Sequence, residues 1–134
     1  MNGLPDPFRS WLDARGWRLR AHQAALLAQA RDGRSALLVA PTGGGKTLAG
    51  FLPSLVELAT DPAPGLHTLY VSPLKALAID VHRNVEKPIA EMALDIRAET
   101  RTGDTPQAKR VRQRKSPPHI LMTTPESLAL LLSY

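Results

Sequence analysis

The chain alternates between short apolar runs and longer segments whose apolar residues recur at helical spacing. Continuous or alternating apolar runs predict strands at residues 35–40, 67–72, 94–99 and 119–124. Helical spacing, bounded by proline or glycine, predicts helices at 5–15, 20–31, 46–58, from 74 onward, 106–115 and from 125 onward. We expect Pro53 to bend its helix and Pro88 to end, bend or restart the next one. The alternation predicts an α/β fold with three layers, in which helices cover both faces of a mainly parallel sheet.

Two of the predicted strands differ in pattern. Residues 35–40 are almost entirely apolar, which indicates a strand that is buried on both faces. In 94–99, Leu94, Ile96 and Ala98 alternate with charged residues, so one side meets water and we place this strand at a sheet edge. The chain closes on a leucine-rich helix without a C-terminal cap, so we expect this helix to continue and the sheet to be incomplete at the C-terminus.

Composition and charge narrow the class of protein. A length of 134 residues suits one hydrophobic core, and 17 Lys and Arg against 12 Asp and Glu give a net charge of +5, which favours a polyanionic partner. The absence of cysteine excludes disulfides, thiolate metal sites and thiol catalysis, and it fits a cytoplasmic protein. No apolar run approaches the length of a membrane span, so we expect no membrane partner.

A glycine-rich segment, APTGGGKT at 40–47, connects the first predicted strand to a helix. Glycines let successive N–H groups turn toward phosphate oxygens, and the helix N-terminus adds its dipole. This pattern predicts an ATP site with Mg²⁺ in which Lys46 binds the phosphates and Thr47 ligates the metal, both as candidate catalytic residues. The predicted cofactor-binding residues here are Pro41, Thr42, Gly43, Gly44, Gly45, Lys46 and Thr47. With Ala40 in place of the usual first glycine, the segment resembles motif I of superfamily-two helicases.

Upstream, RLRAHQAALL at 18–27 resembles the Q-motif region of the same helicases. Gln23 is the matching residue, with Arg20 three positions before it, and the resemblance implies that both lie at the cofactor. A glutamine amide has the donor and the acceptor that the adenine edge requires. Trp17 and Phe8 are candidates to stack on the base, with a place in the core as the alternative.

Three further segments lie after predicted strands, where ligands of open α/β sheets gather. VSPLKALAIDV at 71–81 resembles motif Ia, ETRTGDTP at 99–106 resembles a Thr-Gly-Asp element of related helicases, and TTPESLALLL at 123–132 resembles motif Ib. Lys75 and the N–H groups of the helix starts suit a phosphodiester, and Gly103 is free to take a positive φ. The predicted nucleic-acid-binding residues are Pro73, Leu74, Lys75, Thr102, Gly103, Thr124, Pro125 and Glu126.

A basic run, KRVRQRK at 109–115, lies on a predicted helix. It is either a solvated face or a loose phosphate contact, since charge runs are common and it has no aromatic residue for base stacking.

Taken together, these motifs resemble the superfamily-two DEAD/DEAH-box DNA helicases, and the Lhr (large helicase-related) family most of all, including its bacterial branch found with DNA ligases. The resemblance implies a RecA-like P-loop domain and an N-terminal fragment of a longer protein. Residues 1–34 would form N-terminal helices with the Q-motif-like segment, and 35–134 the first part of helicase domain 1.

For the whole protein, the resemblance implies ATP-dependent 3′-to-5′ movement on single-stranded DNA, or on a duplex with a single-stranded tail or an RNA–DNA hybrid, in DNA repair with ligase or nuclease partners. The 134 residues contain no Asp-Glu-x-His Walker B motif, so we expect no ATP hydrolysis from them alone. A P-loop nucleotide-metabolising enzyme and a non-catalytic nucleic-acid-binding module stay open as alternatives.

Overall fold

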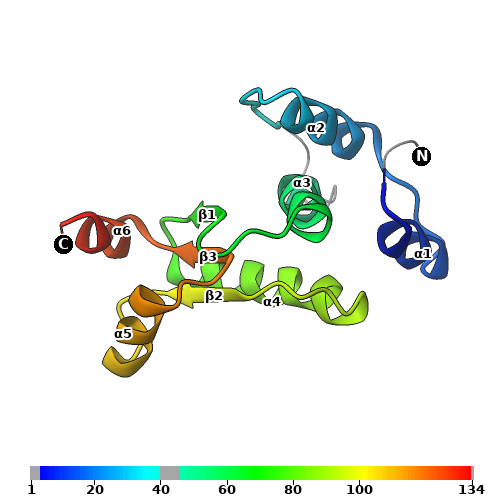
Figure 1. Cartoon of the computed structure of the whole chain (residues 1–134). Helices are drawn as coiled ribbons and strands as arrows, with labels where there is room; N and C mark the ends of the chain where they lie inside the picture. The colour runs from blue at the N-terminus through cyan, green and yellow to red at the C-terminus, as the bar shows by residue number, and fades with distance from the viewer. Residues whose placement is uncertain (1–3, 40–45, 134) are drawn as a thin grey trace. The chain divides into compact units, whose positions relative to one another are not determined.

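The computed structural model describes residues 4–39 and 46–133, and Figure 1 shows their helices and strands. The chain forms two compact units, each described here by itself. The first contains Met1–Pro62 and Pro88–Leu94, and the second contains Ala63–Lys87 and Asp95–Tyr134. Among the described residues, we find no helix whose length and apolar character would let it cross a membrane.

The first unit is helical. It contains α1 (Asp6–Ala14), α2 (Ala21–Arg31), α3 (Lys46–Thr60) and the end of α4 (Lys75–Glu91), close to the helices that the spacing predicts. α1 ends at Gly16, which has a φ of 66°, a conformation that glycine adopts without strain. The core is apolar, with Phe8 fully buried and Leu52 and Leu55 nearly so, and α2 packs against α3.

One prediction about this unit needs correction. Residues 35–39 form no strand, and Leu37 and Val39 are 89% and 86% exposed. A buried strand needs hydrogen-bonded neighbours, and no strand in the described part of the chain pairs with this segment.

Both predicted proline positions lie inside helices. α4 continues through Pro88 to Glu91, so of the three alternatives for Pro88 the helix does not end there. Pro88 and Ile89 are buried, and the Pro88 carbonyl accepts the N–H of Met92. α3 likewise runs through Pro53, and a bend at either proline stays a prediction.

The second unit is built on a sheet whose described strands are all parallel. β3 (Ile120–Thr123) lies between β1 (Thr68–Val71) and β2 (Ala98–Arg101). All four residues of the central strand are buried, as expected for a strand covered on both faces. β2 lies at an edge, as predicted. The strand begins at Ala98 rather than at residue 94, although the Arg97 carbonyl already accepts the N–H of Ile120 and Ile96 follows the predicted burial alternation.

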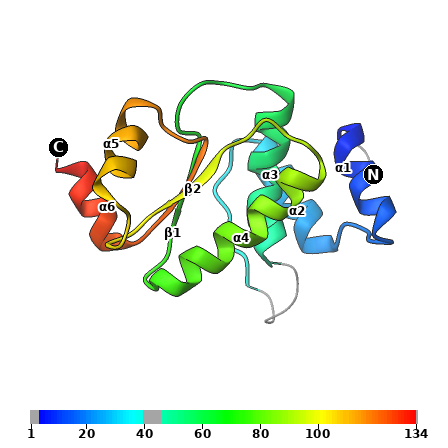
Figure 2. The ribbon, with the colours of Figure 1, turned by 90° about the horizontal axis from the view of Figure 1, so that it is seen from below.

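Helices follow each strand of this unit. In α4, Ala78, Val81 and Val85 are buried, and the His82 ring lies 2.7 Å from the carbonyl oxygen of Ala98 in β2. α5 (Gln107–Lys115) follows β2, and α6 (Pro125–Leu132) follows β3. Figures 1 and 2 both show α5 and α6 at the same end of the sheet.

Candidate functional site

The predicted phosphate-binding residues that the structure describes lie at the start of α3. Lys46 is the exposed first residue of this 15-residue helix, and Thr47 is half-buried in the same turn. The first turn carries no acidic side chain, so the free N–H groups, the positive end of the dipole and the ammonium group all favour an anion. This end of α3 therefore fits a nucleotide phosphate. Pro41, Thr42, Gly43, Gly44 and Gly45, with Ala40, lie outside the described residues.

Gln23 caps the start of α2, a structural role in addition to its predicted contact with adenine. Its side chain is only 5% exposed in the first turn of α2, and its Oε1 accepts the backbone N–H of Arg20 at 2.9 Å. This is the glutamine half of a capping box, which satisfies an N–H that the helix leaves without a partner. One acceptor site of the amide thus serves the helix, and contact with adenine stays a prediction.

The two candidate stacking residues have different environments. Phe8 is fully buried in the core, whereas Trp17 is 51% exposed and therefore is not a core residue. Trp17 lies edge-on to Trp11 at 5.5 Å between ring centroids, and the guanidinium of Arg15 lies 5.0 and 5.2 Å from the centroids of Trp11 and Trp17. This geometry is typical of cation–π contacts.

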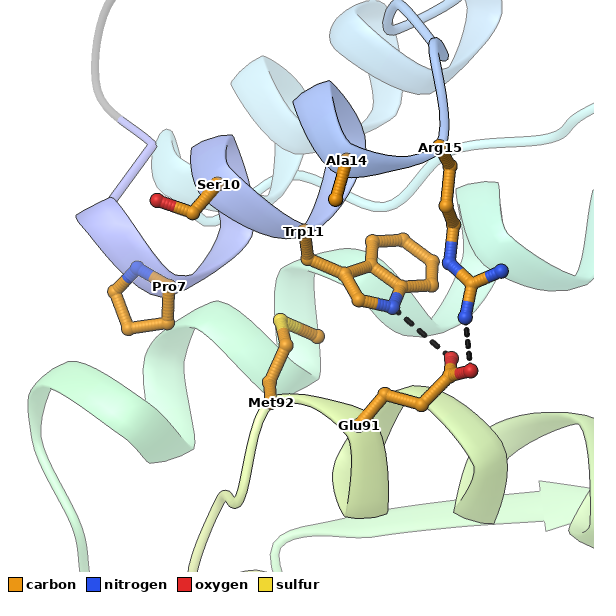
Figure 3. Close-up of a pocket in the computed structure, with 7 residues that line it drawn as sticks. All are labelled: Pro7, Ser10, Trp11, Ala14, Arg15, Glu91 and Met92. Atoms are coloured by element: carbon orange, nitrogen blue, oxygen red, sulfur yellow. Dashed lines mark hydrogen bonds and ion pairs between the residues drawn. The ribbon is translucent and has the colours of Figure 1, made fainter.

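Beside this cluster the first unit has a pocket of about 600 Å³, drawn in Figure 3. One oxygen of Glu91 accepts the indole N–H of Trp11 at 3.0 Å, and the other forms an ion pair with Arg15. These contacts tie α1 to the end of α4. Because both carboxylate oxygens already have protein partners, we assign the cluster a structural role.

In the second unit, the strand register brings three predicted motifs to one edge of the sheet. Val71 pairs with Thr123, and Thr123 pairs with Arg101, so the last residues of the three strands stand in one row. The predicted binding residues of the three motifs begin one or two residues after these strand ends, at Pro73, Thr102 and Thr124. Neighbouring strands are about 4.8 Å apart, so the row spans about 10 Å. The predicted nucleic-acid-binding residues therefore lie side by side, as the sequence requires.

At the end of β1, the chain turns into α4 with a different set of donors from the one we expected. Pro73 has no N–H, and the N–H of Leu74 donates to the hydroxyl of buried Ser72 at 3.3 Å. The amides left for a ligand are those of the first turn of α4, which begins at Lys75. The exposed ammonium of Lys75 forms an ion pair with Asp104, whose carboxylate is mostly exposed.

At the end of β2, side chains hold a closed turn. The N–H of Thr102 donates to Oγ1 of Thr105 at 2.9 Å, and the N–H of Thr105 donates to the carbonyl of Thr102 at 3.2 Å. The N–H of Asp104 lies 3.3 Å from Oγ1 of Thr102. Gly103 is exposed, and its φ is not positive, contrary to our expectation. Within the described residues, its N–H has no acceptor.

At the end of β3, the predicted helix start is confirmed. Thr124 is the N-cap of α6, and its Oγ1 accepts the N–H of Ser127 at 3.4 Å, with Pro125 at the first helical position. The N–H of Glu126 is left for a ligand, while its exposed carboxylate interacts favourably with the helix dipole. Any phosphate contact here is therefore a backbone contact.

The comparison with known families agrees with this geometry. The sequence profile described as "DEAD/DEAH box helicase" matches residues 20–133. The chain belongs to the DEAD/DEAH box helicase family. The match includes the start of α3 and all three loops at the sheet edge, and its fold is the α/β fold of the RecA-like domains in these proteins.

Within this family, the chain is similar to Lhr helicases over nearly its whole length. In an alignment 145 positions long, it is 39% identical to the ATP-dependent helicase Lhr-Core protein 2 of Thermococcus barophilus. The alignment covers 97% of this chain and 17% of the relative. The structure of Mycobacterium smegmatis helicase Lhr bound to ssDNA and AMP-PNP matches with a TM-score of 0.91 and 39% identity, over 99% of this chain and 18% of that one.

The crystal structure of the DUF1998 helicase MrfA bound to DNA and AMPPNP also matches. Its TM-score is 0.85 at 35% identity, over 94% of this chain and 17% of that one. The chain thus spans under a fifth of the length of these helicases.

The sequence did not predict a role for two residues at the sheet edge of this helicase chain. Asp104 is the ion-pair partner of Lys75, and Arg110 on α5 donates to the carbonyls of the Gly103 turn. Both lie in segments that the sequence singles out, the Thr-Gly-Asp element and the basic run. Their partners could not be identified, because no local pattern states which side chains meet across two loops.

Proposed function

We propose that the chain forms the first part of the ATP-binding domain of a helicase that moves on single-stranded DNA. The observation that carries this proposal is the row of three loops at the carboxyl edge of the sheet, with two helix starts and an exposed lysine along it. Membership of the helicase family and the relatives with ssDNA, DNA and an ATP analogue support it.

The nucleic-acid contacts that we propose are mainly backbone contacts. N–H groups at the starts of α4 and α6 and at Gly103 would donate to phosphate oxygens, and Lys75 would add the positive charge. Contacts of this kind read the backbone and not the bases, which suits a protein that has to move along a strand regardless of its sequence.

The nucleotide contacts that we propose lie in the first unit. Lys46 would hold the phosphates, Thr47 would ligate Mg²⁺, and Arg20 and Gln23 would lie at the adenine. Bound ATP would supply the phosphoanhydride bond whose hydrolysis drives movement. Because Asp-Glu-x-His does not occur in the 134 residues, we expect the chain alone to show no DNA-stimulated ATP hydrolysis.

We extend the proposal to the whole protein on the resemblance to Lhr helicases. It would move 3′ to 5′ on single-stranded DNA, unwind tailed duplexes or RNA–DNA hybrids, and act in cytoplasmic DNA repair beside a ligase or a nuclease. A strand-displacement assay with 3′-tailed and 5′-tailed duplexes tests the polarity, and unwinding of the 5′-tailed substrate alone would reverse it.

The binding of single-stranded DNA by the 134-residue chain tests the interface. We expect Lys75→Met to weaken binding and to reduce the salt dependence of log K by about 0.7, the contribution of one phosphate contact on a single strand. Lys87→Met is the matched control. It removes the same charge from the same helix twelve residues away, about 18 Å along the axis, and should leave the slope unchanged. An equal slope for wild type and Lys75→Met contradicts a phosphate contact at Lys75.

Fluorescence anisotropy with and without AMP-PNP distinguishes the two alternatives. A nucleotide-metabolising enzyme would bind the analogue but not single-stranded DNA. A non-catalytic nucleic-acid-binding module would bind DNA with the same affinity whether or not the analogue is present. A helicase domain requires binding of both and a change in DNA affinity when the analogue is added.

A further inference from the structure

The basic helix α5 holds an arginine that is turned toward the protein and not toward solvent. Arg110 is half-buried, and its Nη2 donates to the carbonyl oxygen of Thr102 at 2.9 Å and to that of Gly103 at 3.2 Å. A second arginine of the helix, Arg112, is also engaged, in an ion pair with Glu99 at 3.0 Å. Two arginines of the basic run therefore bind other groups of the protein.

Arg110 and Thr105 together fix the direction of the Gly103 amide, because both donate to the carbonyl of Thr102. In a trans peptide the carbonyl and the following N–H point in opposite directions. The peptide that joins Thr102 to Gly103 has its carbonyl on Arg110, so the N–H of Gly103 is aimed away from Arg110. Within the described residues this N–H has no acceptor, and an added Cβ at Gly103 would meet no atom within 4 Å. The amide is therefore left without a protein acceptor in the described structure, and the space on the Cβ side of Gly103 is open.

We infer that Arg110 is a positioning residue for nucleic-acid binding, which it supports by holding the Gly103 N–H in place to donate to a phosphate oxygen. The inference rests on the proposed function. Within the described residues, the guanidinium donates hydrogen bonds to these two carbonyls and its Nε has no hydrogen-bond partner, so we expect its contribution to binding to pass through the turn. A phosphate contact and a positioning contact both weaken binding when they are lost, but only the first removes a counterion-releasing charge from the interface.

Arg110→Met tests this inference, because it keeps a long apolar stem and removes the donors. We expect binding of the 134-residue chain to single-stranded DNA to weaken roughly fivefold to tenfold, from the partial loss of one hydrogen bond to a charged oxygen. The slope of log K against log salt should stay equal to that of the wild type. Hydrogen exchange of the turn amides should become faster in the absence of DNA, since the turn loses two bonds.

Two further variants separate positioning from charge and from folding. Arg110→Lys keeps the charge and one group that can donate to the carbonyls, so it should recover a large part of the lost affinity. Lys115→Met removes the same charge from the last residue of α5, which bonds to no atom of the turn in the described structure, and its affinity and exchange rates should match the wild type.

The outcomes are distinct. A slope reduced by about 0.7 in Arg110→Met would show a direct phosphate contact and overturn the positioning role. Wild-type affinity in Arg110→Met, or failure of Arg110→Lys to recover any affinity, would overturn it as well. Absence of DNA binding by the wild-type chain would instead remove the proposed function, and this inference with it.

Discussion

Replacement of Gly103 by alanine should separate stability from nucleic-acid binding. Among the described residues, the glycines with positive φ are Gly16, Gly33 and Gly65, and Gly103 is not one of them. A Cβ built on Gly103 meets no atom within 4 Å. Neither the backbone conformation nor the packing of the described residues therefore requires a glycine here. The remaining physical reason for a glycine is the close approach of a molecule from outside the turn.

The two effects have opposite signs. Alanine at a compatible position stabilises a protein by about 0.4–1 kcal/mol, mainly because the unfolded chain loses conformational freedom. For a domain of this size, this corresponds to a rise in Tm of roughly 1–5 °C. At the sheet edge, the added methyl group would keep a phosphate from the Gly103 N–H. A hydrogen bond to a charged group contributes about 1.5–3 kcal/mol, so we expect DNA affinity to fall by about tenfold or more.

Thermal unfolding by circular dichroism and fluorescence anisotropy with single-stranded DNA measure the two effects on the same samples. Gly50→Ala is the matched control. Gly50 is exposed in α3, has no positive φ and also has open space around its Cα, so alanine should stabilise the helix by about 1 kcal/mol and leave DNA affinity unchanged. Lower stability of Gly103→Ala, or unchanged DNA affinity, would refute the reasoning.

Three other changes test separate parts of the molecule. Lys46→Ala should abolish binding of AMP-PNP by removing the charge partner of the phosphates, and retained binding in isothermal titration calorimetry would contradict the assignment. Asp104→Asn should raise the affinity for single-stranded DNA up to about fivefold, because it removes a negative charge and the ion pair that occupies Lys75. A lower affinity would mean that Asp104 holds Lys75 in its binding position. Phe8→Ala should lower the free energy of unfolding by about 3–5 kcal/mol, since Phe8 is fully buried, and Phe8→Leu should lower it by much less. Urea titration followed by tryptophan fluorescence measures both variants. A loss below about 1 kcal/mol in Phe8→Ala would show that α1 folds independently of the core.

The helix boundaries were the part of the fold that the sequence predicted best, because their causes are local. Thr124 caps α6 through its own hydroxyl, and Gly16 ends α1 with its positive φ. The strand at 94–99 shows where local pattern stops being sufficient. Ile96 and Ala98 are buried as the alternation predicts, but β2 begins only at Ala98, since pairing depends on β3, about twenty residues away.

The prediction of a strand at 35–40 was wrong because strand formation depends on pairing with distant residues. An uninterrupted apolar run indicates that burial of the segment would be energetically favourable, but it does not identify the neighbouring strands and helices that would bury it. In the described residues, the sheet is formed by β1, β2 and β3, and Leu37 and Val39 stay exposed. Hydrophobicity predicts a strand only when the partners of its backbone groups are also present.

The candidate interface has the same division between local and long-range causes. Local signals place a helix start after β1 and after β3 and a turn after β2, and the parallel register alone then brings them into one row. What the sequence could not supply was the state of each charge. The basic run carries the densest positive charge, yet Arg110 donates to the carbonyls of Thr102 and Gly103 and Arg112 pairs with Glu99, just as the isolated Lys75 pairs with Asp104. The density of positive charge along a sequence therefore does not identify the cations that are paired within the protein, because the partner of each cation comes from another segment of the chain.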